Sequence, residues 1–390
     1  MYRMTRFGEV MKGLSRGMFD RMVSKRQADK YSKGFGAWDQ MLVMIYAQLS
    51  GCKSLRDIET GFNQHAMHHY HLGCRRVKRS TLSDANANKD AGLFMDICQS
   101  LLTQVNRKVR HDVKAHLMLL DSSSISLKGL GFDNWTRDNS TRNTQGIKLH
   151  MMYSQETQTP SYLNITSANV NDITDANDMP LEKGATYVFD KGYCDYNWWH
   201  KINTSKAFFV TRFKRNAALT VIHENTICSQ AKDIILADTV VQFSHARPRA
   251  KYLNHYASPL RQVVIARPEH DTPLVLATND FKRSALEIAE CYKSRWQIEL
   301  FFKWIKQNLK IKRFLGRSEN AVRIQIYTAI ISYLLVALYR HAKNLTGSMK
   351  ESFIVICTTL FQRPETEQYL MEKQRRKAQL WALQQQGMLL

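Results

Sequence analysis

The chain has 390 residues and carries 56 Lys plus Arg against 34 Asp plus Glu, a formal net charge of +22 at pH 7. This length allows a sizeable core and two or three domains, and it argues against a single small module. The charge far exceeds what solubility requires and is spread along the whole chain. It indicates folded surfaces that bind a polyanion such as duplex nucleic acid, with a generic basic surface as the plainer alternative.

Cysteine usage and the N-terminus indicate the compartment. The seven cysteines are an odd number without a C-x-x-C pair, which argues against a disulfide framework and against a thiolate zinc finger. The N-terminus carries charges every few residues and no apolar run of signal-peptide length. We therefore expect a protein of a reducing compartment that is not secreted.

Apolar residues recur at helical spacing in the first 110 residues. The pattern covers Trp38 to Leu49 and Leu93 to Val105, and it predicts a helix in each. Ser80 and Thr81, with Asp84, are typical of a helix start with its capping side chains. The N-terminal region is therefore expected to be helical.

Short apolar runs replace this pattern from about residue 115. They predict strands, with room for a short helix in Thr174 to Gly184 and another in Tyr196 to Ser205, so that strands and helices alternate. The predicted strands are His116 to Leu120, Ile147 to Tyr153, Tyr162 to Thr166, Thr186 to Phe189 and Ala207 to Thr211.

Residues 213 to about 270 break this alternation and indicate an inserted β segment. After it, Leu274 to Thr278 predicts a further core strand, and Ser284 to about Lys310 predicts one long helix. The strands expected within the insertion are Ala218 to His223, Thr239 to Ser244 and Gln262 to Ala266.

The apolar stretch Ile326 to Tyr339 is the best candidate for a membrane span. It is too short to cross a bilayer, and Arg340 and His341 follow at once. We interpret it as a buried core helix and expect no membrane association. From about residue 364 the chain is rich in Gln, Arg and Lys, which indicates a partly exposed helix or a disordered tail.

Two aspartates follow apolar strands directly, Asp121 in HLMLLDSSS and Asp190 in TYVFDKGY. A carboxylate that leaves a strand end is well placed to bind a metal ion, although an Asp in this position often only caps a turn. A third acid is needed to decide between these interpretations.

The segment CYKSRWQIELFFKWIKQNLK supplies such an acid. Tyr292, Arg295, Glu299 and Lys306 fall at offsets of 0, 3, 7 and 14, which on one continuous helix lie within an arc of roughly 60°. A salt-bridged amphipathic helix would explain Arg295 and Glu299, which are an i, i+4 pair, but would leave the Tyr and the second Lys unexplained.

The sequence resembles DDE transposases of the fourth insertion-sequence family, whose signature Y-x2-R-x3-E-x6-K is matched by these four residues. The resemblance extends to LLDSSS and VFDKGY around the two aspartates, to TSANVNDITD (166–175), and to GCKSLRDI and RSTLSDAN in the N-terminal region. It covers most of the chain.

The resemblance implies an α/β fold: an RNase H-like catalytic core, with a mixed sheet flanked by helices, a β-rich insertion and a helical N-terminal domain. We expect the helical DNA-binding region in residues 1–110 and the core in 111–212 and 271–345. The insertion would occupy 213–270 and a C-terminal helical or tail segment 346–390.

The implied chemistry is metal-dependent. Asp121, Asp190 and Glu299 would be the catalytic acids and hold two Mg²⁺ ions, for which Mn²⁺ may substitute, because hard oxygen ligands favour these cations over zinc. The resemblance further implies that Tyr292, Arg295 and Lys306 grip DNA phosphates. Lys303 and Lys310 add charge beside them and are expected DNA contacts.

The implied function is cut-and-paste transposition by a bacterial, cytoplasmic, nucleoid-associated enzyme. Its partners would be double-stranded DNA, both terminal inverted repeats and target, and a second copy of the chain in a homodimer. No nucleotide cofactor is expected, since strand transfer exchanges one phosphodiester for another and the chain lacks the phosphate-binding glycine motifs. The alternatives are a metal-dependent nuclease on the same fold and a catalytically silent DNA-binding protein descended from a transposase.

Three weaker signals remain. The run HAMHHYHLGC, with His65, His68, His69, His71 and Cys74, fits no zinc spacing, and we assign no metal to it. Asp172, Asp175 and Asp178 precede an apparent helix, which suggests capping, and Asp195 lies beyond the Gly-Tyr turn that follows Asp190. A polar loop after Asp121, with Asp133, Asp138, Arg137, Arg142 and Lys148, is a further candidate for DNA contact.

Overall fold

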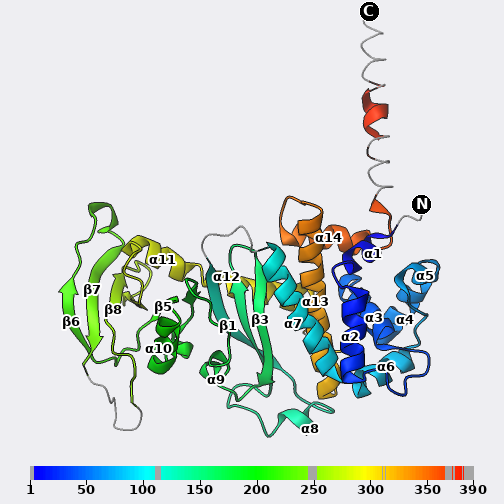
Figure 1. Ribbon diagram of the computed structural model, residues 1–390, viewed down its shortest axis with the longest axis horizontal. Coiled ribbons are helices and arrows are strands. Elements are labelled where there is room, and N and C mark those ends of the chain that lie inside the picture. Colours follow the sequence, from blue (N-terminus) through cyan, green and yellow to red (C-terminus); the bar gives the residue numbers. More distant parts are fainter. Residues whose placement is uncertain are drawn as a thin grey trace, which may run out of the picture. The chain divides into compact units, whose positions relative to one another are not determined.

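The computed structural model describes residues 4–109, 116–244, 253–309, 311, 313–364, 371, 374–379 and 381. The chain forms two compact units (Figure 1). The first comprises Met1–Leu101 with Gln307–Leu390, and the second comprises Leu102–Lys306. The expected tail falls partly within the described residues, where 374–379 are helical and exposed.

The described part of the first unit is helical, as the sequence predicts. Its elements are α1 (Arg6–Met11), α2 (Arg16–Arg26), α3 (Ala37–Leu49), α4 (Leu55–Gln64), η1 (Ala66–His68), α5 (His69–Leu72), α6 (Arg79–Asn88), α13 (Glu319–Ala342) and α14 (Met349–Thr358). Helix α7 (Ala91–Val109) begins in this unit and ends in the second. The expected helix start at Ser80 is wrong: α6 begins at Arg79 and its N-cap, Lys78, makes no side-chain cap bond.

Helix α13 lies against α3 and forms the centre of the first unit. Eighteen of its residues are buried, among them the whole stretch Ile326–Tyr339, so the prediction of a buried core helix is confirmed. By length and composition it is the one helix among the described residues that could cross a bilayer. Besides α3, this helix packs with α1 and α6.

The second unit is built on one nine-stranded mixed sheet in the order β3-β2-β1-β4-β5-β9-β8-β7-β6. Strands β1, β4 and β5 run parallel, and every other neighbouring pair is antiparallel. The strands are β1 (Leu117–Ser126), β2 (Gly146–Ser154), β3 (Thr159–Ser167), β4 (Thr186–Val188), β5 (Phe208–Arg212), β6 (Leu219–Glu224), β7 (Ile235–Phe243), β8 (Leu260–Ile265) and β9 (Leu274–Thr278).

Helices flank this sheet; most of them lie between its strands in the sequence, and α11 and α12 follow the last strand. They are α8 (Asp133–Thr136), α9 (Asp172–Ala176), η2 (Lys191–Tyr193), α10 (Tyr196–Thr204), η3 (Ser229–Ala231), α11 (Ala285–Lys293) and α12 (Trp296–Asn308), the last of which ends in the first unit. An aromatic core that includes Tyr187, Phe189, Tyr193, Trp198 and Trp199 packs around β1, β4 and α10.

Two predicted elements differ from the structure. Strand β1 continues through the polar residues that follow its apolar half, so Asp121 lies within the strand, paired with Met151, and not after its end. The long helix predicted from Ser284 is two helices, because the chain turns at Ser294 and Arg295. There the amide N–H groups of Arg295, Gln297 and Ile298 donate to carbonyls three residues earlier.

The β-rich insertion is part of the same sheet. Strand β8 lies between β9 and β7, and β6 forms the outer edge. Arg261 on β8 and Asp238 on β7 make a buried, bidentate ion pair with N–O distances of 2.8 and 2.7 Å. The Nη1 atom of Arg261 also donates to the carbonyls of Asp280 and Arg283, just before α11. The insertion is thereby tied to the start of the helices that carry Glu299.

Candidate active site

Asp121 lies on β1, and Asp190 lies just beyond the end of the neighbouring parallel strand β4, in a corresponding position. The last paired residues of β1 and β4 are Leu119 and Val188, and each aspartate lies two residues further along its chain. Asp190 caps η2, and its Oδ1 accepts from the amide of Gly192 at 2.7 Å. A Cβ at Gly192 would lie 2.8 Å from that oxygen, so this close approach requires glycine.

Asp121 is partly buried, and its carboxyl experiences the other acids of the site. Its pKa is raised to about 7, chiefly by burial and also by the negative charges of Asp190 and Glu299, while the Ser122 amide and Arg295 act in the opposite direction. The charges of Asp190 and Glu299 thus both act on the carboxyl of Asp121. Mutual repulsion of this kind is relieved by a bound cation.

Glu299 is engaged by an arginine. Its Oε1 lies 2.5 Å from Nη2 of Arg295, and both side chains are mostly buried. Among the residues that the structure describes, no three Asp, Glu, His or Cys side chains are close enough together to hold one metal ion. The oxygen donors suit Mg²⁺ or Mn²⁺ in kind, whereas their spacing here is wider than coordination requires.

The turn at Ser294 and Arg295 divides the Y-x2-R-x3-E-x6-K residues between two helices. Tyr292 lies on α11, Arg295 in the turn, and Glu299 and Lys306 on α12. The expectation that all four share one face of a continuous helix is therefore wrong. Two of them still lie close enough to the aspartates to interact with their charges: Tyr292 experiences the charges of Arg295 and Asp190, and Arg295 that of Asp121.

Lys306 reaches the acid-bearing strand. Its Nζ donates to Ser123 Oγ at 2.6 Å and to the carbonyl of Ser124 at 3.2 Å. Ser123 shares a face of β1 with Asp121, because alternate residues of a strand point the same way. Lys303 is exposed on the same helix, and Lys310 lies outside the described residues.

Sequence reasoning missed two kinds of residue here. Arg212, at the end of β5, hydrogen-bonds to Tyr292. The one signal in the sequence for its role is that it ends the strand next to β4, after which Asp190 follows. The interpretation of Asp172 and Asp175 as helix caps is wrong, since Asn171 is the N-cap of α9 and makes no side-chain bond. Their carboxylates face the sheet instead, where Asp175 accepts from Asn164 at 2.6 Å.

Of the other candidates, Lys148 is not part of a DNA-facing loop. It lies on β2, is mostly buried, and its Nζ is 3.1 Å from Asp172. Asp195 caps α10 by accepting from the amide of Trp198. His69 is buried with Nε2 3.0 Å from the carbonyl of Phe62, and His65 stacks on Phe361.

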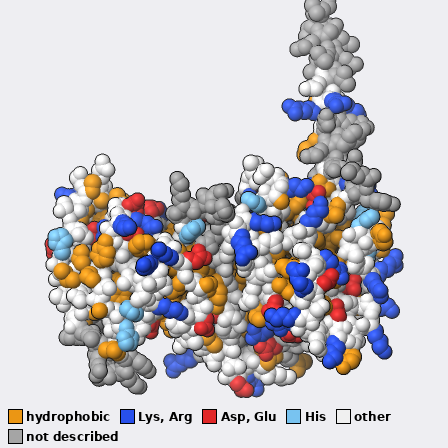
Figure 2. Space-filling model, in the orientation of Figure 1, with side chains coloured by type: hydrophobic (Ala, Val, Ile, Leu, Met, Phe, Trp, Pro, Cys, Tyr) orange, Lys and Arg blue, Asp and Glu red, His pale blue; other side chains and the backbone are white. Residues whose placement is uncertain are grey.

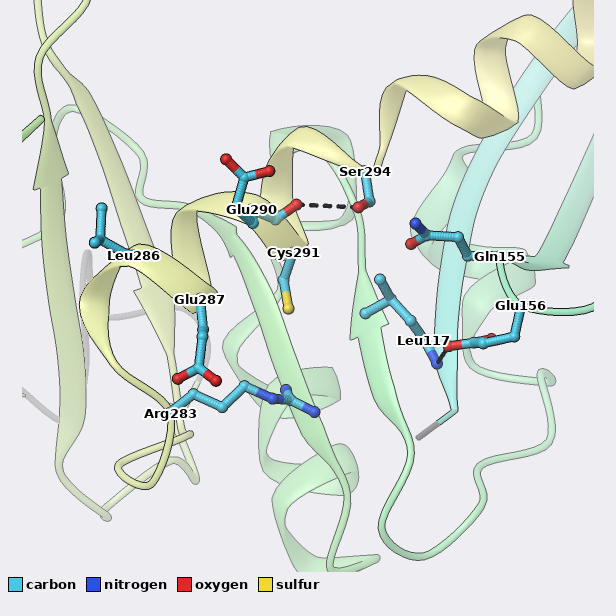
Figure 3. Close-up of a pocket in the computed structure, with 9 residues that line it drawn as sticks. All are labelled: Leu117, Gln155, Glu156, Arg283, Leu286, Glu287, Glu290, Cys291 and Ser294. Atoms are coloured by element: carbon cyan, nitrogen blue, oxygen red, sulfur yellow. Dashed lines mark hydrogen bonds between the residues drawn. The ribbon is translucent and has the colours of Figure 1, made fainter. Parts of the chain in front are cut away.

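A pocket of about 700 Å³ lies at the other end of β1 (Figure 3). Leu117, which begins the strand, lines it together with residues of α11 such as Glu287, Glu290 and Cys291. Since strand residues advance by about 3.3 Å, Leu117 is roughly 13 Å from Asp121. This pocket is therefore separate from the acids.

Basic side chains are scattered over the visible face of both units and do not gather in a single stripe (Figure 2). This distribution agrees with the spread of Lys and Arg along the sequence. A surface of this kind attracts a polyanion through many weak contacts, each of which responds to salt.

Comparisons with known proteins extend these observations. Residues 114–335 match the family model described as "Transposase DDE domain", and residues 3–75 match a domain of unknown function, DUF4372. A Sinorhizobium fredii protein described as a transposase, y4zB, is 40% identical over 282 residues, which are 72% of this chain and 77% of that protein. A Geobacillus stearothermophilus protein described as a transposase for insertion sequence element IS5377 is 26% identical and covers 74% of each chain.

Among solved structures, the piggyBac transposase synaptic complex with hairpin DNA aligns with 95% of this chain and 84% of that chain. Its TM-score is 0.49 at 11% identity. This likeness is too distant to bear on the reaction.

Proposed function

Because this chain belongs to the transposase DDE-domain family, and is thus an insertion-sequence transposase that cleaves DNA and transfers strands, we propose that Asp121, Asp190 and Glu299 are its catalytic acids. The observation that carries the proposal is the electrostatic coupling of Asp121 to both other acids. Carboxylates from β1, from the end of β4 and from α12 that repel one another supply the hard oxygen ligands that divalent cations take.

The proposed cofactors are two Mg²⁺ ions, for which Mn²⁺ can substitute. When bound, such ions supply a nucleophilic oxygen at neutral pH and stabilise the charge on the leaving oxygen of an in-line displacement. Asp121 and Asp190 would hold them from adjacent strands. Glu299 would join them once Arg295 releases it.

Arg295 is proposed to exchange partners when DNA binds. A phosphodiester is an anion that suits the guanidinium fork as well as a carboxylate does. Transfer of Arg295 from Glu299 to the phosphate beside the scissile bond would order the DNA and free Glu299 for the cations. Tyr292 and Lys306 would grip neighbouring phosphates, with Lys303 and Lys310 further along.

We assign the chain to the fourth insertion-sequence family and its sheet to the RNase H-like class. The tetrad supports the first assignment. The arrangement of β3, β2 and β1 as an antiparallel meander, with β4 and β5 added parallel to β1, supports the second. We further propose that a helical N-terminal region binds the terminal inverted repeats and that a homodimer holds both ends and the target.

The test uses a plasmid that carries the coding region with its native flanking DNA, purified protein and Mg²⁺. Asp121→Asn, Asp190→Asn and Glu299→Gln should each lower cleavage by roughly 1,000-fold or more, because each removes several kcal/mol of charge stabilisation. Binding of the ends should be largely kept. Unchanged cleavage in all three variants would overturn the site assignment, and hydrolysis without joined product from a precleaved 3′ end would indicate a nuclease.

A further inference from the structure

Asp172 makes a network behind the strand that carries Asp121. Its Oδ1 accepts from Ser122 Oγ at 2.8 Å and from Lys148 Nζ at 3.1 Å. The same Nζ donates to the carbonyl of Val170 at 2.7 Å. The start of α9, the strand β2 and the strand β1 therefore meet at one carboxylate.

The network holds β1 from the face opposite Asp121. Ser122 pairs with His150 and Ser124 with Lys148 across β1 and β2, so these four residues share a face. Asp121 pairs with Met151 and points to the other face, where Lys306 of α12 contacts Ser123. The main chain at Asp121 is thus fixed from both sides.

The second oxygen of Asp172 faces the other acid. A Cβ built on Gly192 would lie 3.6 Å from Asp172 Oδ2 and 2.8 Å from Asp190 Oδ1, so the two carboxylates flank this glycine. Tyr193, the next residue, is fully buried, and its hydroxyl has no hydrogen-bond partner among the residues that the structure describes. The charges of Asp172, Asp121 and Asp190 all act on that hydroxyl.

A buried polar group without a hydrogen-bond partner costs free energy, so its presence calls for an explanation. His150 is also fully buried; its Nε2 lies 2.8 Å from Thr166 Oγ1, and its Nδ1 is 3.7 Å from Asp172 and 3.9 Å from Asp175. A lone cap of a five-residue helix does not require a paired lysine, a serine from a neighbouring strand and a buried histidine.

We propose that Asp172 is a positioning residue for the divalent-cation site and acts through Ser122 to fix the main chain of Asp121 beside Asp190. The inference rests on the proposed function, because it takes Asp121 and Asp190 as ligands. Groups that orient metal ligands in this way typically change metal affinity by roughly 10- to 100-fold when they are removed.

The experiment measures Mn²⁺ binding to the full-length protein without DNA, by the loss of the free-ion signal in electron paramagnetic resonance. Asp172→Ala and Ser122→Ala should each weaken Mn²⁺ binding by roughly 10- to 100-fold. The double variant should bind Mn²⁺ no more weakly than the weaker-binding single variant, since both substitutions remove the same contact between Asp172 and Ser122. Asp178→Asn, an exposed acid just beyond the same helix, is the matched control and should bind Mn²⁺ as the wild type does.

Thermal unfolding of each variant separates misfolding from loss of positioning. If Asp172→Ala fails to fold, Ser122→Ala carries the test, because it removes the same contact between Ser122 and Asp172. Normal Mn²⁺ affinity in folded Ser122→Ala would overturn the inference, and if Asp172→Ala were impaired at the same time, Asp172 would be a direct ligand.

Asp121→Asn distinguishes this inference from the function on which it rests. Loss of Mn²⁺ binding in Asp121→Asn together with normal binding in both the Asp172 and Ser122 variants would overturn the inference alone. Normal binding in Asp121→Asn would overturn the proposed function itself.

Discussion

The guanidinium of Arg295 lies 2.5 Å from the carboxylate of Glu299, one turn further along α12. Since a carboxylate bound to arginine is less available to a cation, the free protein should hold its metal ions weakly. If Arg295 exchanges Glu299 for a DNA phosphate as proposed, binding of DNA would increase the affinity of the acids for metal ions.

Arg295→Gln tests this relationship in the DNA-free protein. We expect Mn²⁺ affinity to rise several-fold, because Glu299 is released, while cleavage falls because a phosphate contact is lost. Calorimetric titration with Mn²⁺ measures the first effect. Lys303→Gln removes an equal charge one turn beyond Glu299 and should leave Mn²⁺ affinity nearly unchanged; an equal rise in both variants would point to net charge alone.

The raised pKa of Asp121 predicts that this residue destabilises the metal-free protein. The folded state keeps the proton up to about pH 7, whereas an unfolded Asp releases it near pH 4. The folded state thus binds more protons between these values, and stability falls as the pH rises through that window. Asp121→Asn removes the effect.

Urea denaturation of metal-free protein at pH 4.5 and pH 8 measures the difference. Asp121→Asn should gain stability over the wild type as the pH rises, by at most about 4 kcal/mol for a shift of about three pKa units. Mg²⁺ should stabilise the wild type and not the variant. A constant difference between the two proteins at both pH values would contradict the raised pKa.

Lys306→Gln should reduce the salt dependence of DNA binding. If Lys306 contacts one phosphate, the slope of log Kobs against log salt should become shallower by about one. Fluorescence anisotropy of a labelled duplex between about 50 and 200 mM salt gives this slope. An unchanged slope would mean that Lys306 contacts no phosphate and only hydrogen-bonds to Ser123 and Ser124.

The buried pair of Arg261 and Asp238 should be important for stability. Arg261→Met leaves a buried carboxylate without its partner and should cost about 3–5 kcal/mol, as measured by urea denaturation. Arg215→Met, at an exposed arginine of the same segment, should cost little. A small loss of stability in Arg261→Met would mean that the attraction between Arg261 and Asp238 does no more than offset the cost of removing both charges from water.

Much of the fold could be predicted from the sequence, because apolar periodicity reports the faces that pack. The strands β2, β4, β5 and β9 and the helix α13 follow such patterns closely, whereas β7 begins four residues before the predicted strand. The polar half of β1 could not be found in this way. Ser122 hydrogen-bonds to Asp172 on one face and Ser123 to Lys306 on the other, and those partners come from distant parts of the chain.

The sequence predicted which residues belong to the candidate site, but not how the helices that carry them are divided. Asp121 and Asp190 were proposed from their places after apolar strands, and Arg295 and Glu299 from their spacing and the family resemblance. In the structure the charges of Asp190, Glu299 and Arg295 all act on Asp121. The turn at Ser294 interrupts a pattern that is continuous in the sequence, so periodicity could not indicate it. Asp172 and Lys148 were assigned to a cap and a loop because their pairing joins residues 24 positions apart.

The position of β8 between β9 and β7 limits how this protein can be altered. A surface loop can be shortened or exchanged between relatives without exposing new backbone, whereas removal of residues 213–270 would strip β9 of one neighbour and leave its amide and carbonyl groups unpaired. Chimaeras that graft this segment from another relative must therefore match strand register as well as loop length. Swaps that ignore register should give aggregated protein even when every acid is retained.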